Sequence, residues 1–267
     1  MAMERNPEHD HGAAGRSRDS STAWPRGSAW VIFSDFDGTI TQADVTDRIL
    51  EELAHPLWRE VEDEWVRGLI GSRECLERQM ALVDASAEEL NALIDAIPLD
   101  PTFGEFYQFT RREGIPFYVL SDGFDYVVSR ILQRAGVNGE LENGKHLYAS
   151  HLEITGRRLA ASFPHAGCPH GCATCKAAVM RRLRDDNSKA VFIGDGFSDR
   201  FAVEEADAVF AKSQLLVYCR RHNIRCRAFE TFAGVQAKLR GLAGGRDPKL
   251  SRENASKRTG MPVGKLD

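Results

Sequence analysis

The chain has 267 residues, 42% of them hydrophobic, which is enough for one large folded unit or two small ones. Its 35 lysines and arginines stand against 39 aspartates and glutamates, and the resulting net charge of −4 indicates neither a nucleic acid nor an anionic membrane surface as partner. No apolar run approaches the roughly eighteen residues that cross a bilayer, and the polar N-terminal stretch lacks the apolar segment of a secretory signal. We therefore expect a cytoplasmic protein that binds a small ligand.

Changes in composition divide the chain into an arm, a patterned body and a tail. Residues 1–27 and the basic residues 243–267 are predicted to be disordered. Within the body, we expect a catalytic core built from residues 28–43 and 99–242. Residues 44–98 are expected to form a separate helical cap.

Short β-rich runs alternate with helical segments along the body, and this pattern predicts an α/β fold. The segment 124–135 has the apolar spacing of a helix that returns across a sheet, and Gly136 fits its C-terminal cap. We expect a doubly wound, Rossmann-like parallel sheet. Its predicted strands are Trp30–Ser34, Pro116–Leu120, Ala190–Ile193 and Ala208–Ala211.

The segment 44–98 interrupts this alternation because it holds only helical signals. Its last helix is predicted to begin with a capping box, in which Ser86 and Glu89 satisfy each other's backbone amides. A helical unit inserted between the first two strands predicts a small cap over the sheet.

Two aspartates follow the first predicted strand. Asp35 and Asp37 lie on one face if the strand period of two continues, at the end of the sheet where α/β proteins bind ligands. Two neighbouring carboxylates repel each other unless a cation or a shared proton compensates them, and Mg²⁺ is the natural compensator. The alternative is an ordinary Asp-Gly turn.

Three later segments carry further polar groups. Ser121 and Gly123 follow the second strand, where a hydroxyl and a bare backbone amide could bind a phosphate, although Ser121 could instead cap a helix. Lys176 begins a helical stretch and is either a phosphate ligand or a solvated surface lysine. Asp195 and Asp199 follow a third strand and offer oxygen ligands to Mg²⁺. Phosphoryl transfer needs this combination of groups.

In this combination and order, the motifs resemble those of the haloacid dehalogenase superfamily. The resemblance spans Val31 to Lys212 and includes Asp-Phe-Asp-Gly-Thr, a later Ser, a Lys and a closing Gly-Asp-Gly-x-x-Asp. The helical insertion is similar to the small cap of the subgroup that contains phosphoserine and phosphoethanolamine phosphatases. Asp44 and the Cys-x-x-Cys-Lys arrangement are similar to those of the methionine-salvage phosphatases that act on 2-hydroxy-3-keto-5-methylthiopentenyl-1-phosphate.

The resemblance implies a role for each matching residue. Asp35 would attack phosphorus to form an aspartyl-phosphate, and Asp37 would protonate the leaving alkoxide and then deprotonate the hydrolytic water. Asp35, Asp195 and the backbone carbonyl of Asp37 would hold Mg²⁺, and Asp199 would position these ligands.

The resemblance also implies a phosphate cradle and a cap contact. Ser121, Gly123 and Lys176 would bind the transferring phosphoryl group. Asp44 would face the substrate from the cap, where an Asp in place of the longer Glu of phosphoserine phosphatases counts against phosphoserine. Apart from the resemblance, the cap residues that could contact the leaving group are Trp58, Trp65, Arg67 and Arg73, and no motif fixes the direction of any of them.

A cysteine cluster precedes the lysine. Cys168, Cys172 and Cys175 with either His165 or His170 could form a tetrahedral Zn²⁺ site that stiffens the loop before Lys176. The alternative is a reduced loop without metal.

These observations favour a Mg²⁺-dependent phosphatase for a small phosphorylated metabolite. The alternatives within this chemistry are phosphoserine, phosphoethanolamine and phosphocholine phosphatases. A receiver-like signalling module also combines acids, a hydroxyl and a lysine on such a sheet, but it needs no cap. A non-catalytic, zinc-stabilised binding protein is a third possibility. The sequence leaves the physiological substrate and the oligomeric state open.

Overall fold

A computed structural model of the chain describes residues 30–137, 141 and 144–243. The predicted disordered arm lies outside the described residues, and so does the predicted tail beyond residue 243. No helix in the described part of the chain is long and apolar enough to cross a membrane.

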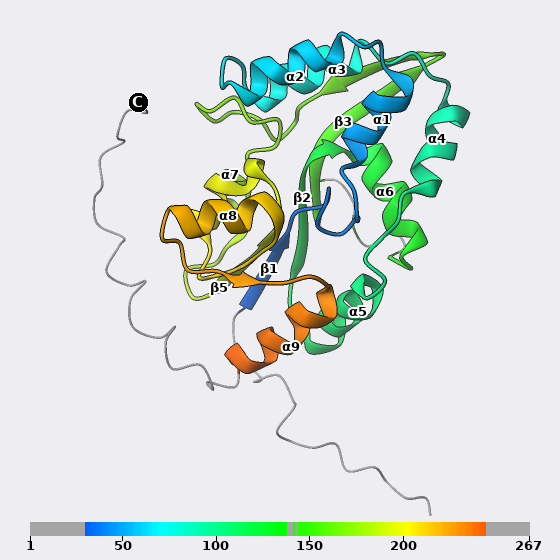
Figure 1. Cartoon of the computed structure of the whole chain (residues 1–267). Coiled ribbons are helices and arrows are strands. Elements are labelled where there is room, and N and C mark those ends of the chain that lie inside the picture. Colours follow the sequence, from blue (N-terminus) through cyan, green and yellow to red (C-terminus); the bar gives the residue numbers. More distant parts are fainter. Residues whose placement is uncertain (1–29, 138–140, 142–143, 244–267) are drawn as a thin grey trace, which may run out of the picture.

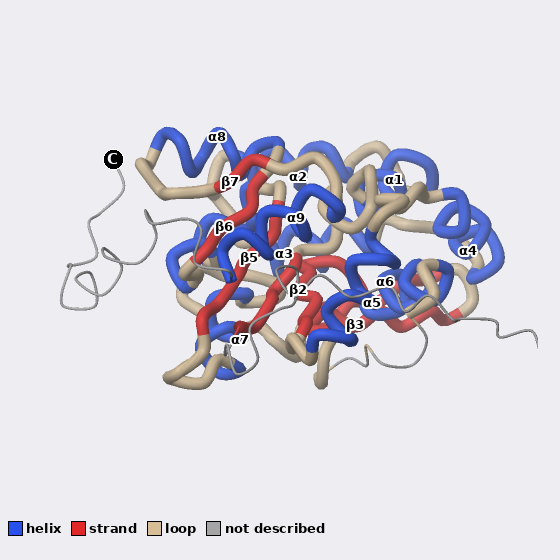
Figure 2. Tube along the Cα trace, turned by 90° about the horizontal axis from the view of Figure 1, so that it is seen from below, coloured by secondary structure: helices blue, strands red, loops and turns tan. Residues whose placement is uncertain are grey.

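The fold is built on one seven-stranded sheet with the order β4-β3-β2-β1-β5-β6-β7 (Figures 1 and 2). Neighbouring strands are parallel except β3 and β4. From β1 the chain builds outward through β2 to β3 and β4, and it then returns to the other side of β1 to add β5. This reversal of direction confirms the predicted doubly wound α/β fold. The strands are β1 Trp30–Ser34, β2 Phe117–Phe124, β3 Leu147–Thr155, β4 Arg158–Ser162, β5 Lys189–Gly194, β6 Ala208–Ala211 and β7 Arg227–Ala228.

Helices cover both faces of the sheet. Successive side chains of a strand point to opposite faces, so each central strand contributes to two hydrophobic clusters. Ile32 belongs to the hydrophobic cluster under α5, α6 and α9, whereas Val31 and Phe33 belong to the cluster under α7 and α8. The helices over the cluster of Ile32 are α5 Phe103–Glu113, α6 Asp125–Arg134 and α9 Phe232–Ala243. Those over the cluster of Val31 and Phe33 are α7 Lys176–Leu183 and α8 Ser213–Arg221. The predicted helix at 124–135 is confirmed, and Gly136 follows it with φ +76°.

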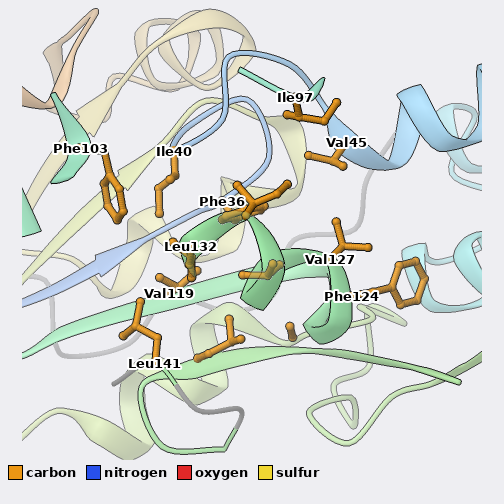
Figure 3. Close-up of a cluster of buried hydrophobic side chains, with 14 of the residues drawn as sticks. Phe36, Ile40, Val45, Ile97, Phe103, Val119, Phe124, Val127, Leu132 and Leu141 are labelled. Atoms are coloured by element: carbon orange, nitrogen blue, oxygen red, sulfur yellow. The ribbon is translucent and has the colours of Figure 1, made fainter. Parts of the chain in front are cut away.

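The insertion between β1 and β2 is helical, as predicted. Its last helix begins with the predicted capping box: the Ser86 hydroxyl accepts from the Glu89 amide, and the Glu89 carboxylate accepts from the Ser86 amide. The core continues into this insertion, since Val45 and Ile97 pack beside Phe36 (Figure 3). The inserted helices are α1 Val45–Leu53, α2 Trp58–Val66, α3 Ser72–Met80 and α4 Ala87–Ala96.

The antiparallel hairpin β3–β4 was not predicted, and it connects the cap to the core. The Ala85 amide donates to the Arg157 carbonyl at 3.1 Å, and Asp84 forms an isolated bridge with Arg158. The outer half of this hairpin carries many exposed polar residues, so the sequence there lacks the buried pattern of the central strands. The division into a core and a cap at residues 44–98 stays a prediction.

Candidate active site

Three adjacent strands bring the predicted residues to one edge of the sheet. Asp35 directly follows β1, Ser121 lies near the end of β2, and Asp195 directly follows β5. Because β2 and β5 flank β1 and all three run parallel, their carboxyl ends meet (Figure 1). This is the point of reversal in strand order where doubly wound sheets bind ligands.

Lys176 is buried at this edge between two aspartates. Its Nζ lies 2.7 Å from Asp35 Oδ1 and 2.6 Å from Asp199 Oδ1, and the three side chains are 3%, 6% and 0% exposed. Burial opposes the charged form, but the carboxylates of Asp199 and Asp35 outweigh it and hold the pKa of Lys176 well above its usual value. The alternative of a solvated surface lysine is therefore wrong.

Three carboxylates gather around this lysine. Ligand oxygens of Asp35, Asp195 and Asp199 lie within 4.8 Å of one another, and no other such group of His, Cys, Asp or Glu occurs among the described residues. Burial and the charge of Asp199 raise the pKa of Asp35, and the same causes raise the pKa of Asp195 to about 6. An all-oxygen set with excess negative charge fits Mg²⁺.

The Asp37 carboxylate points to a different set of partners. Asp37 Oδ2 accepts from the Ser121 hydroxyl at 3.0 Å, and Oδ1 accepts from the Val45 amide of the cap at 3.1 Å. Burial, followed by the charge of Asp44, raises the pKa of Asp37 to about 7. The side chain can therefore hold a proton near neutral pH. The role of Asp37 as a metal ligand through its backbone carbonyl stays a prediction.

Ser121 bonds to residues at this edge and does not cap the following helix. Its Oγ accepts from the Gly123 amide at 2.9 Å, while α6 begins after Phe124 without a side-chain cap. A Cβ on Gly123 would lie 2.8 Å from Asp37 Oδ2, so the close approach requires glycine there. Gly38 has φ +66°, and a Cβ on it would collide with the Asp195 carboxylate.

A cavity of about 330 Å³ lies between this edge and the cap. Asp44 lines it as expected, and it also caps α1 by accepting from the Asp47 amide at 3.0 Å. Desolvation, followed by the charge of Asp47, raises the pKa of Asp44 to about 7. The lining residues are Asp35, Asp37, Asp44, Thr46, Asp47, Glu62, Trp65, Ser72, Cys75, Leu76, Gln79, Asp122, Gly123, Lys176, Asp195, Gly196, Phe197, Ser198, Ser213 and Gln214.

Several residues at the site were not predicted. The Thr39 hydroxyl donates to Asp195 Oδ1 at 2.8 Å, and Lys212 donates to the Thr39 carbonyl at 3.3 Å. Half-buried Asp122, whose pKa is raised by desolvation, accepts from the Thr174 amide at 3.0 Å. Thr39 could have been found from its place in the first motif, whereas Lys212 carries no local signal.

The predicted zinc site has no support in the described residues. The Cys168 thiol contacts those of Cys172 and Cys175, but these atoms do not converge as the three aspartates do. The two histidines make ring contacts elsewhere, His165 with Tyr148 and His170 with Phe201. The loop is anchored by hydrogen bonds instead. The Cys175 amide donates to the His165 carbonyl, and the Ala173 amide donates to the Ser72 hydroxyl of the cap.

The chain is similar to proteins of known family. The sequence model of haloacid dehalogenase-like hydrolases matches residues 32–204. A 2-hydroxy-3-keto-5-methylthiopentenyl-1-phosphate phosphatase of Bacillus cereus is 31% identical over 218 residues, which cover 80% of this chain and 97% of the relative. Its namesake from Bacillus thuringiensis (strain Al Hakam) is also 31% identical, covering 79% and 96%. A substrate-bound phosphoserine phosphatase structure shares the fold, with a TM-score of 0.61, 17% identity and coverage of 79% and 98%.

Proposed function

Because the chain belongs to the family of haloacid dehalogenase-like hydrolases, we propose that it hydrolyses a small phosphate monoester with Mg²⁺ through an aspartyl-phosphate intermediate. The observation that carries this proposal is the convergence of Asp35, Asp195 and Asp199 on the buried ammonium group of Lys176. These groups come from distant parts of the sequence and supply a nucleophile, oxygen ligands for a metal and a cation for phosphate.

Asp35 is held in place for nucleophilic attack. Its Oδ1 accepts from the Phe36 amide at 2.7 Å and from Lys176 at 2.7 Å. Both contacts use the same oxygen, which leaves Oδ2 to attack phosphorus. The ammonium group of Lys176 then offsets negative charge on the transferring phosphoryl oxygens.

Asp37 acts as general acid and then as general base in the proposed reaction. With its pKa raised to about 7, it holds a proton that it gives to the leaving oxygen, and it afterwards takes one from the water that hydrolyses the intermediate. The hydrogen bonds from Ser121 and Val45 orient its carboxylate during both steps.

The acidic triad fits a magnesium ion because its ligand atoms are carboxylate oxygens at close spacing. Asp35 and Asp195 would hold Mg²⁺, which when bound neutralises charge on the phosphoryl group, and Asp199 would position these ligands. The Asp199 Oδ2 atom also accepts from the Asp195 and Gly196 amides at 3.2 Å each, which fixes the loop that carries Asp195.

We infer that the physiological substrate is 2-hydroxy-3-keto-5-methylthiopentenyl-1-phosphate. The support is the 31% identity to phosphatases of that name over nearly their whole length. Phosphoserine phosphatases share the fold at only 17% identity. Phosphoethanolamine and phosphocholine remain alternative substrates. The receiver-like module is disfavoured by the family membership and by the cap residues that line the cavity.

Phosphate release from a panel of phosphomonoesters tests this function, with Mg²⁺ or with a chelator. We expect Mg²⁺-dependent turnover that Asp35→Asn lowers by about three orders of magnitude or more while circular dichroism stays unchanged. Exposed Asp63, on α2 and outside the cavity lining, provides the matched control Asp63→Asn, which should keep full activity. Undiminished release by folded Asp35→Asn would overturn the proposed nucleophile.

A further inference from the structure

One wall of the cavity supplies no group that reacts in the proposed chemistry. It is formed by cap residues Asp44, Asp47, Glu62 and Gln79, which we call the acceptor wall. All four lie on or at the start of the inserted helices, whereas the proposed reacting groups lie at the edge of the sheet. The part of a substrate that faces this wall is therefore the leaving group.

Gln79 offers the cavity an oxygen acceptor. Its side chain is 1% exposed, and its Nε2 donates to Glu62 Oε2 at 2.9 Å. Among the described residues, no donor pairs with its amide oxygen. A buried amide oxygen that borders a cavity without a partner favours a ligand that donates a hydrogen bond.

The carboxylates of the wall also lack cationic partners. Glu62 contacts Gln79 and the Cys75 thiol, and in the described part of the chain neither Glu62 nor Asp47 forms an ion pair with Lys or Arg. Lys176 is the one Lys or Arg side chain among the described residues that line the cavity, and Asp35 and Asp199 hold it at the catalytic end.

This distribution of charge selects among leaving groups. A carboxylate on the leaving group would face Glu62 and Asp47 without a cation to compensate it, and like charges brought together in a partly desolvated site repel each other strongly. Hydroxyl or ammonium donors would instead satisfy the acceptors. Trp65 and Leu76 border the same space and can cover an apolar portion of the leaving group.

We propose that the substrate's leaving group carries hydrogen-bond donors and no carboxylate, and that Glu62 and Gln79 recognise those donors. This inference rests on the proposed function and narrows its substrate class. The leaving group named for the relatives is one source of hydroxyl donors, and an amino alcohol is a source of ammonium donors.

Two matched pairs of esters test the proposal. Phosphoethanolamine and phosphoserine differ by a carboxylate beside an ammonium group, and glycerol 3-phosphate and 3-phosphoglycerate differ by a carboxylate in place of a hydroxymethyl group. We expect kcat/KM to be at least about tenfold higher for the donor ester of each pair. Equal values within both pairs would overturn the proposal. A comparison of kcat/KM for phosphoethanolamine with that for glycerol 3-phosphate shows whether ammonium or hydroxyl donors are preferred.

Variants of Glu62 and Gln79 test whether the acceptor wall causes the preference for the donor esters. Glu62→Gln removes the negative charge at nearly constant shape. It should raise KM for the donor esters and change kcat little, so that the ratio of kcat/KM within each pair falls about fivefold. Gln79→Met removes the unpaired oxygen and should raise the same KM values. The adjacent Asp63→Asn is the matched control and should leave every ratio unchanged. A ratio that survives both wall variants would overturn the assignment to Glu62 and Gln79.

A binding measurement separates this inference from the proposed function. Asp35→Asn is titrated calorimetrically with the four esters in the presence of Mg²⁺, so that affinity is measured without turnover. Preferential binding of the donor esters supports the inference, even if the wild-type chain hydrolyses none of them and the proposed function fails. Equal affinity within each pair, or no binding of any ester, overturns the inference.

Discussion

The sheet edge with Asp35, Lys176 and Asp199 and the acceptor wall border one cavity but are built in opposite ways. At the edge, Asp35, Lys176 and Asp199 are at most 6% exposed and bonded to one another. On the wall, Glu62 is half-buried and Asp47 is exposed, and neither has a cationic partner in the described part of the chain. The proposed reacting groups are therefore fixed by a closed network, whereas Glu62 and Asp47, which are proposed to face the leaving group, lie outside this network.

This difference has an energetic basis. Removing one member of a buried ion network leaves an uncompensated charge away from water and costs several kcal/mol. Removing a partly solvated acceptor costs little stability, because water replaces the lost partner. We therefore expect substitutions at the edge to affect chemistry and folding together, and substitutions of Glu62 or Asp47 to affect mainly KM.

The largest expected effect is on the chemical step and concerns Asp37. Asp37→Asn should lower kcat for an alkyl ester such as glycerol 3-phosphate by about 10²–10⁴-fold, because the leaving alkoxide no longer receives a proton. The first-turnover release of 4-nitrophenolate from 4-nitrophenyl phosphate needs no such proton and should fall much less. Stopped-flow measurement of both leaving groups checks this. Equal losses would show that Asp37 does not act as the acid.

The network at the edge is tested by Lys176→Met. We expect a loss of about 3–5 kcal/mol in the free energy of unfolding, because Asp35 and Asp199 lose their shared cation. Urea denaturation measures it, and added Mg²⁺ should restore part of the loss. Exposed Lys189, which begins β5, provides the control: Lys189→Met should change stability by less than about 0.5 kcal/mol. Similar losses for the two variants would contradict the proposed network.

Two tryptophans of α2 allow effects on stability and effects on KM to be compared within the cap. Trp58 is 8% exposed and packs in the main hydrophobic cluster, so Trp58→Ala should cost about 3 kcal/mol of stability. Trp65 lines the cavity and is half-buried, so Trp65→Ala should raise KM with a smaller loss of stability. Thermal melts and steady-state kinetics on both variants check the pair. The opposite assignment of effects would show that Trp58 and not Trp65 contacts the substrate.

The smallest expected effect is at the capping box of α4, remote from the cavity lining. Ser86→Ala should destabilise the protein by about 1 kcal/mol, because the Glu89 amide loses its acceptor. Ser86→Thr keeps a hydroxyl and should be close to wild type. Both variants should retain the wild-type KM, and a raised KM for Ser86→Ala would show that α4 positions the acceptor wall.

The parts predicted from sequence are those with strong local signals. Continuous apolar runs before Asp35 and Asp195 marked the central strands correctly, and the helical insertion and its capping box are confirmed. The phosphatase assignment within its family is also confirmed. The hairpin β3–β4 was missed, because its exposed polar residues obscure the strand pattern. The proposed zinc site is not supported, since cysteine spacing alone does not determine where the thiols point.

Strand periodicity and short motifs are local properties, so the amino-acid sequence alone predicts the order of the proposed reacting groups and the place of the aspartates and Ser121 near strand ends. The partners of each group follow from the tertiary fold: Lys176 lies between two carboxylates, Asp37 bonds to the cap, and Gln79 borders the cavity. Such contacts join residues far apart in the chain. They arise from the order of strands and the packing of helices, which no single segment of sequence specifies.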